Sequence, residues 1–319
     1  MNITVEIQDK VGGISTENYK LTRLAFAKHL ALAGQKSYLT PQKLIQTFAN
    51  LIRYSPYIQR YSFENDKFSE PPSHLSDPTE KGQFSNLAGK AIADFLSKRI
   101  GKSLYTQNYE GAMNDAGVPI KGQRPDLIAF TQTERFAIEA KGFSVPNVSD
   151  KEMIKHKKQS KEGRIPVDYT VACVSYNLYE EVKCNYYDPE NDNKPTNHKL
   201  LQSLSKKYYS GFAKFLEEKY FYFDTIEFQN ETFYKVQLLP RFFKEFFKDD
   251  YYYFKNCCHP HCFYECMELH RPSLLLPEKI KDFAHNGLTN ETKPFIFDIY
   301  QEYKNTYIDN DRIGLQIKF

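Results

Sequence analysis

The segment from Arg124 to Gly142, RPDLIAFTQTERFAIEAKG, carries two acids and a lysine at regular places along two short apolar runs. Asp126 stands at the head of a short apolar run, and Glu139 stands near the end of the next run, two residues before Lys141. In an extended strand, residues two apart share a face, so Glu139 and Lys141 are expected to point the same way. The pattern therefore predicts a carboxylate and an ammonium group side by side.

The polar residues TQTE between the two runs have the character of a hairpin turn, which would return Asp126 beside Glu139. Two carboxylates this close repel each other unless a cation lies between them. Magnesium prefers oxygen ligands and keeps several waters, which suits two acids and a substrate phosphate. Lys141 would then orient or deprotonate the attacking water and offset charge on the phosphate. The alternative is an ordinary ion pair between Glu139 and Lys141 on an exposed strand.

The order of these residues resembles the PD-(D/E)XK nuclease superfamily, which includes most type II restriction endonucleases. Pro125 and Asp126 are followed by twelve residues and then by Glu139, Ala140 and Lys141. The surrounding order of expected elements, a helix, strands, a helix and a strand, is similar to that of the family. A metal-dependent nuclease is therefore the activity that the resemblance implies.

The resemblance extends over residues 77–190 and implies a mechanism. Asp126 and Glu139 would hold one or two magnesium ions, for which manganese substitutes, with the backbone carbonyl of Ala140 as a further ligand. Lys141 would position a water that attacks phosphorus in line, displaces the 3′ oxygen and leaves a 5′ phosphate. The expected activity is that of a type II site-specific deoxyribonuclease that cuts double-stranded DNA.

Two other functions stay open at this point. One is a nuclease of the same fold that acts in repair, transposition or phage defence without strict sequence specificity. The other is a non-catalytic DNA-binding protein in which the motif is accidental. For the restriction enzyme, cutting both strands of a symmetric site is simplest with a homodimer. A cognate DNA methyltransferase is then expected in the same system, but not as a stable subunit.

A further metal ligand is expected on the helix that precedes the sheet. Related nucleases often carry an extra carboxylate there, and Glu80 takes that place in this chain, with Asp94 on the flank of the same helix as a weaker candidate. Glu80 has an alternative role, because it would also complete a capping box at the start of the helix. Arg124, next to the motif, is expected to touch a phosphate.

A basic stretch over residues 151–164 follows the motif. In the family that this chain resembles, the corresponding helix often lies near the DNA backbone. Lys155 and Lys158 are therefore expected to contact phosphates, and Gln159 stands where some members place a polar site residue. The equal alternative is a solvated basic helix without a DNA contact.

Composition excludes several classes of protein. The 319 residues include 43 Lys and Arg against 40 Asp and Glu, so the net charge of +3 gives no overall basic field, and any DNA-binding charge must be local. No run of about 18 apolar residues is present, and the start MNITVEIQDK lacks the pattern of a signal peptide. These features predict a soluble cytoplasmic protein that does not enter a membrane.

The cysteines indicate reduced thiols and not a disulfide framework, because four of the 6 crowd into the segment CCHPHCFYEC. A structural zinc ion held by Cys257, Cys258, Cys262 and Cys266 is the alternative for this segment. It lacks paired C-x-x-C knuckles, so buried free thiols are favoured over zinc.

The expected fold is of the α/β (α+β) class, with a restriction-endonuclease-like mixed central sheet flanked by helices. Three regions are predicted: a helical N-terminal segment over residues 1–64, a nuclease core over residues 77–190, and an aromatic-rich C-terminal region over residues 198–319. The last region is expected to pack on the core and to serve target recognition, dimerisation or both. Individual expectations include a strand at Ile3–Ile7, helices at Glu17–Ala33, from Thr40 and from Pro78, and a hairpin around Asn230.

Overall fold

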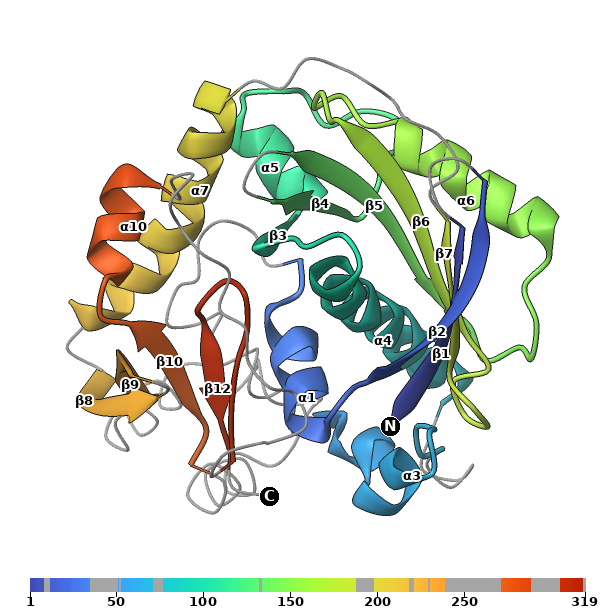
Figure 1. The fold of residues 1–319 in the computed structure, drawn as a ribbon, viewed down its shortest axis with the longest axis horizontal. Helices are drawn as coiled ribbons and strands as arrows, with labels where there is room; N and C mark the ends of the chain where they lie inside the picture. The colour runs from blue at the N-terminus through green and yellow to red at the C-terminus, as the bar shows by residue number, and fades with distance from the viewer. Residues whose placement is uncertain are drawn as a thin grey trace.

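The computed structural model contains two β-sheets with helices packed on both (Figure 1). It describes residues 1–8, 12–34, 51, 53–70, 77–131, 134–187, 198–217, 221–228, 230–238, 271–287 and 305–317. Within these residues the class is mixed α/β, as the sequence predicts. No helix in the described residues is long and apolar enough to cross a bilayer.

The larger sheet has seven strands in the order β2-β1-β7-β6-β5-β4-β3. Its strands are β1 (Asn2–Gln8), β2 (Ile14–Lys20), β3 (Tyr105–Asn108), β4 (Leu127–Phe130), β5 (Arg135–Gly142), β6 (Tyr169–Tyr176) and β7 (Lys183–Tyr187). The pairs β5·β6 and β1·β7 are parallel, and the other neighbours are antiparallel. The predicted mixed central sheet is therefore confirmed.

Helices cover both faces of this sheet. The elements are α1 (Arg23–Leu32), η1 (Ser55–Ile58), α3 (Arg60–Glu64), α4 (Pro78–Arg99), α5 (Tyr109–Asp115) and α6 (Asp150–Lys161). Figure 1 shows α4 and α6 on opposite sides of the strands. Helix α4 begins at Pro78 because the carboxylate of Asp77 accepts a hydrogen bond from the N–H of Thr79. Helix α6 begins with a capping box between Ser149 and Glu152.

The N-terminal segment differs from the prediction of a helix over Glu17–Ala33. Strand β2 occupies Ile14–Lys20, and α1 begins only at Arg23, with Thr22 as its N-cap. The helical start expected at Glu17 is overridden because all seven residues of β2 pair with β1. The expected strand at Ile3–Ile7 is present as β1. Because β1 pairs with β7, this hairpin extends the central sheet instead of forming part of a helical cap.

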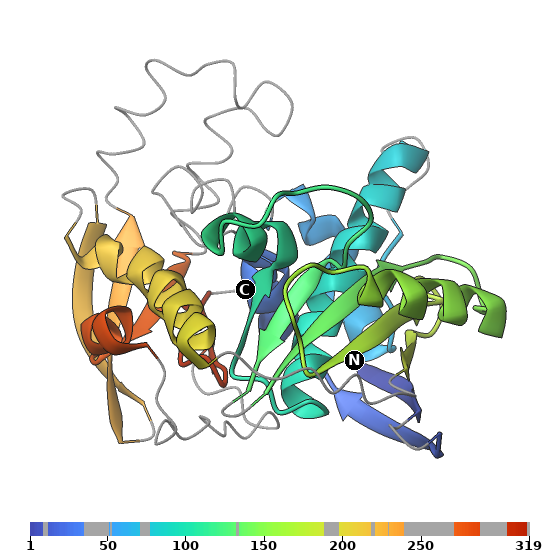
Figure 2. The ribbon, with the colours of Figure 1, turned by 90° about the horizontal axis from the view of Figure 1, so that it is seen from above.

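The C-terminal region forms the second sheet, which is antiparallel in the order β11-β12-β10-β9-β8. Its elements are α7 (His198–Ala213), η2 (Lys214–Leu216), β8 (Phe221–Phe228), β9 (Glu231–Leu238), β10 (Ser273–Pro277), α10 (Ile280–Asn286), β11 (Thr306–Ile308) and β12 (Gly314–Gln316). The hairpin around Asn230 is confirmed, with Asn230 at a positive φ of 63°. Figure 2 shows this sheet, with α7 and α10, beside the central sheet. The helix from Thr40 up to residue 50 and the cysteine segment lie outside the described residues.

A buried ionic cluster joins the two sheets. Its members are Lys28 and His29 of α1, Asp94 and Lys98 of α4, and Asp309 and Asp311 between β11 and β12, all nearly inaccessible to solvent. The Lys98 ammonium lies 3.1 Å from Asp309 Oδ2, and the Lys28 ammonium lies 2.7 Å from Asp311 Oδ2. Each buried charge thus has an opposite charge beside it, as low-dielectric surroundings require.

Candidate active site

Strand register brings the two predicted carboxylates together. Leu127 pairs with Ile138 in the antiparallel β4·β5 pair, so the preceding residue, Asp126, lies opposite Glu139. The N–H of Asp126 donates a hydrogen bond to the carbonyl of Ile138 at 3.0 Å, which continues the ladder by one residue. The alternation in the sequence therefore gave the correct pairing.

Glu139 and Lys141 project from the face of the sheet that α6 covers. Phe136 of β5 packs close to Gly101, just after α4, so even-numbered residues of β5 face α4. Glu139 and Lys141 must then face the other way, because side chains alternate along a strand. Their neighbours on β6, Ala172 and Val174, pack against Met153 of α6, which agrees with this assignment.

The ammonium group of Lys141 lies between the two carboxylates. Its Nζ is 2.5 Å from Oε1 of Glu139 and 3.1 Å from Oδ2 of Asp126. The N–H of Ala140 donates a further hydrogen bond to Oδ2 of Asp126 at 3.2 Å. The contact with Glu139 is an ion pair without hydrogen-bond geometry, and within the described chain neither oxygen of Glu139 accepts a hydrogen bond.

The surroundings shift the proton affinities of this group. Glu139 is fully buried, and burial together with the nearby charge of Asp126 raises its pKa to about 7, against the pull of Lys141. Burial opposes the charged form of Lys141, but Asp126 and Glu139 outweigh it, so the pKa of Lys141 rises. Lys141 therefore stays protonated at neutral pH, while Glu139 exchanges its proton near pH 7.

Helix α4 sets the position of this strand end through two glycines. A side chain on Gly142 would overlap the backbone carbonyl of Ser85, and one on Gly89 would overlap the backbone of Lys141 and Gly142. The two backbones can approach this closely only because neither position carries a Cβ. The glycine that ends the EAKG sequence is therefore explained by helix packing.

Two further residues, Lys90 and His156, lie near the site but outside the sequence motif. Lys90 of α4 brings its Nζ to 3.7 Å from Oδ1 of Asp126. His156 of α6 is almost completely buried, and its pKa is lowered by burial and then by the charge of Lys141. Within the described residues its Nδ1 has no hydrogen-bond partner. The three- and four-residue spacing of buried positions along α6 would have found His156, whereas no local pattern singles out Lys90.

The donor set at the site fits a hard divalent cation. Asp126 and Glu139 offer carboxylate oxygens, and those of Glu139 are buried and lack hydrogen bonds from the described chain. No group of three or more His, Cys, Asp or Glu side chains within the described ranges is arranged to hold a metal. A magnesium ion bound here would therefore complete its shell with a backbone carbonyl, for which the resemblance names Ala140, and with water.

Two acids on α4 lie apart from this group. Glu80 forms an ion pair with Arg53, with 3.2 Å between Oε1 and Nε, instead of the predicted capping box. It lies in the first turn of α4, more than a helical turn before Ser85, the residue that touches Gly142. Asp94 belongs to the buried cluster, where it accepts a hydrogen bond from Thr106 and pairs with His29. The structure thus does not bring either acid beside Glu139.

The predicted DNA contacts lie on and beside α6. Lys155 and Lys158 are exposed on this helix, on the side away from the sheet. Gln159 donates a hydrogen bond to the carbonyl of Arg124 at 3.3 Å, so it ties α6 to the segment that leads into Asp126. The guanidinium group of Arg124 pairs with Glu110 and would have to leave it to contact a phosphate.

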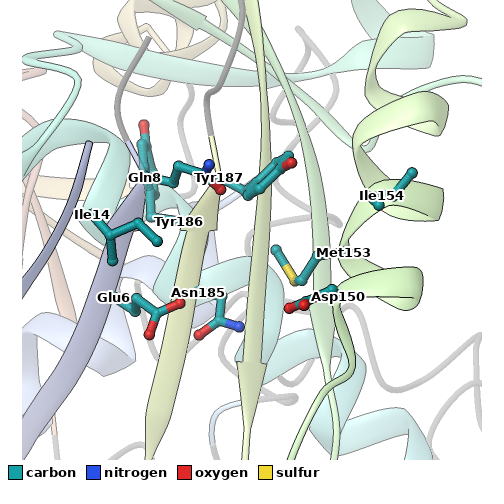
Figure 3. A pocket seen from close by; sticks show the side chains of 9 residues that line it. All are labelled: Glu6, Gln8, Ile14, Asp150, Met153, Ile154, Asn185, Tyr186 and Tyr187. Carbon is teal, nitrogen blue, oxygen red and sulfur yellow. The ribbon is translucent and has the colours of Figure 1, made fainter. Parts of the chain in front are cut away.

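A pocket of about 320 Å³ lies on the same face of the sheet but at its other end. Figure 3 shows Met153 reaching into it from α6, opposite Asn185 and Tyr187 on β7. Glu6 and Asp150 also line the pocket, and none of the predicted catalytic residues does. Among the described residues its lining includes two acidic and no basic side chains, so this pocket does not suit a phosphate.

Comparison of the chain with protein-family models, with curated proteins and with solved structures found no match. The geometry of Asp126, Glu139 and Lys141 and the sequence resemblance are therefore the two grounds on which a function can be proposed.

Proposed function

We propose that the protein is a magnesium-dependent DNA endonuclease, most simply a type II restriction enzyme. The observation that carries the proposal is the placement of Lys141 between two facing carboxylates at the start of β4 and near the end of β5. An ordinary surface ion pair does not explain this arrangement, because Glu139 is fully buried. The neighbouring carboxylate of Asp126 further raises the energetic cost of a negative charge on Glu139.

Each residue has a role that follows from its position. Asp126 and Glu139 would hold the cation, and the carbonyl of Ala140 would complete the protein's contribution. Magnesium, when bound, would supply positive charge to the phosphoryl oxygens. Because its pKa is raised, Lys141 acts as a hydrogen-bond donor that orients the attacking water and does not remove its proton.

The surface around the site supports a duplex partner. Lys155 and Lys158 are exposed on α6, the helix that covers the face from which Glu139 and Lys141 project. Lysines in such positions bind phosphates without reading bases, so they would add to the affinity for a duplex. Discrete cleavage products would identify a restriction enzyme, whereas a ladder of products would identify a nuclease of the same fold without strict specificity. The homodimer and the cognate methyltransferase stay predictions of the restriction interpretation.

Incubation of the purified protein with plasmid DNA, with and without magnesium, tests the proposal. The wild type should cut only with a divalent cation, and Asp126→Ala and Lys141→Ala should each lower the rate by at least about a hundredfold. Glu134→Gln, an exposed position on the same hairpin, is the matched control and should cut normally. Intact DNA with every cation, or equal cutting by the two site variants, would show that the motif is not catalytic.

A further inference from the structure

The carboxylate of Asp126 is contacted by a different lysine on each oxygen. Lys141 approaches Oδ2 at 3.1 Å, and Lys90 approaches Oδ1 at 3.7 Å from α4. The side chains of Asp126, Lys90 and Lys141 are exposed to similar extents, 27%, 26% and 25%, so all three charged groups meet solvent at the mouth of the site. Lys90 is thus as accessible to solvent as the predicted catalytic lysine.

The two lysines take different places relative to the carboxylates. Lys141 lies between Asp126 and Glu139, where a cation shared by both acids would bind. A cation that enters must therefore displace the Lys141 ammonium, whereas Lys90 is on the other oxygen of Asp126. The stem of Lys90 passes beside Gly34, where an added Cβ would come within 3.2 Å of its Cδ. Because Lys90 approaches Oδ1 and Lys141 approaches Oδ2, a cation shared with Glu139 does not have to displace Lys90.

The charges at the site suit one divalent ion. As cation ligands, Asp126 and Glu139 contribute two negative charges, which Lys90 and Lys141 match with two positive charges. These four charges cancel, so one divalent cation gives the site a net charge of plus two. A phosphodiester carries one negative charge and gains a second during attack by water, so its charge in the transition state balances that of the site. A second divalent cation would leave an excess of two positive charges in a partly buried site, where such an excess is costly.

We propose that Lys90 takes the place of a second metal ion, so that the site binds one divalent cation per chain and Lys90 contacts the phosphodiester directly. This inference rests on the proposed function, since it assumes that a phosphodiester is the substrate. Lys90 would stabilise charge on the phosphoryl oxygens opposite the side that the metal ion occupies. A second metal ion would need further acidic ligands, and within the described residues the site has only two carboxylates. The ammonium group of Lys90 supplies the positive charge without such ligands.

Titration with manganese, followed by the electron paramagnetic resonance signal of the free ion, tests the inference without any substrate. The wild type should bind one ion, and Asp126→Asn should abolish this binding. Lys90→Gln should bind that ion on the order of ten times more tightly, because a nearby positive charge is gone. Lys90→Arg keeps the charge and should bind one.

Lys81→Gln is the matched control, since Lys81 lies on the same helix, is 29% exposed and pairs with Glu70. It should behave as the wild type does. The inference is overturned if the wild type binds two ions or none at the Asp126 site, or if Lys90→Gln still binds one with unchanged affinity. Failure of the proposed function is a separate outcome, because it is measured as the lack of plasmid cleavage and does not alter the count of ions.

Discussion

Replacement of Glu139 by glutamine should make the metal-free protein more stable above neutral pH. Glu139 is fully buried, and burial and the neighbouring Asp126 raise its pKa from 4.5 to about 7. Between these two values the folded protein keeps a proton that the unfolded chain has lost. The resulting stabilisation is complete below pH 4.5 and is lost as the pH rises through 7. Glutamine has no such proton to lose.

The difference between the two pKa values corresponds to about 3 kcal/mol, since each pH unit of difference is about 1.4 kcal/mol. The substitution also removes the ion pair between Glu139 and Lys141, which offsets part of the gain. We therefore expect Glu139→Gln to raise the free energy of unfolding at pH 8 by about 1 to 3 kcal/mol. At pH 4.5 the wild type and the variant should be nearly equal, because Glu139 is then protonated in the folded state.

Urea denaturation between pH 5 and 9, without divalent cations, measures this difference directly. The free energy of unfolding of the variant minus that of the wild type should increase with pH and level off above pH 8. Glu134→Gln, exposed on the same hairpin, should follow the wild type at every pH. Millimolar magnesium should stabilise the wild type and leave Glu139→Gln unchanged, because only the charged carboxylate binds the ion. A variant that is less stable than the wild type at pH 8 would refute the reasoning.

Two further predictions concern the elements that support the site. Gly89→Ala should lower both the free energy of unfolding, by about 1 to 3 kcal/mol, and the cleavage rate, because the new Cβ overlaps the backbone of Lys141. Gly82→Ala on the same helix, with no atom within 4 Å of its Cβ, should instead stabilise the protein by up to about 1 kcal/mol. If urea denaturation shows the same effect for Gly89→Ala and Gly82→Ala, close packing at Gly89 is not the cause. Asp309→Asn should destabilise by about 3 to 5 kcal/mol, because Lys98 and Lys28 lose a buried counter-charge, whereas Glu64→Gln in an exposed ion pair should leave the urea midpoint unchanged.

The sequence predicts most of the central sheet because its signals are local. Alternation and the TQTE turn gave the β4·β5 hairpin, and the proline and aspartate at residues 77–78 gave the start of α4. The strand β2 was missed because its pairing partner is β1, and a pairing between segments is not visible in the propensity of either one. The short strands β10 and β11 were missed for the same reason.

At the site, the sequence predicts the residues of one hairpin and fails for residues that arrive from elsewhere. Asp126, Glu139 and Lys141 lie within one short segment, so strand geometry alone brings them together. Lys90 and His156 come from two helices whose placement depends on packing across the whole sheet. Glu80, which the family pattern suggests as a ligand, forms an ion pair with Arg53 in this chain, and its role as a ligand stays a prediction.

Helix α4 connects the candidate site to the C-terminal sheet. Its middle touches the backbone of Lys141 at Gly89 and sends Lys90 to Asp126, while Lys98, about two turns later, pairs with Asp309 between β11 and β12. A helix with hydrogen bonds along its whole length transmits a displacement at one end to the other. Changes in the buried cluster should therefore disturb catalysis by moving Lys90 and Lys141 relative to Asp126, even though the cluster contributes no ligand to the site.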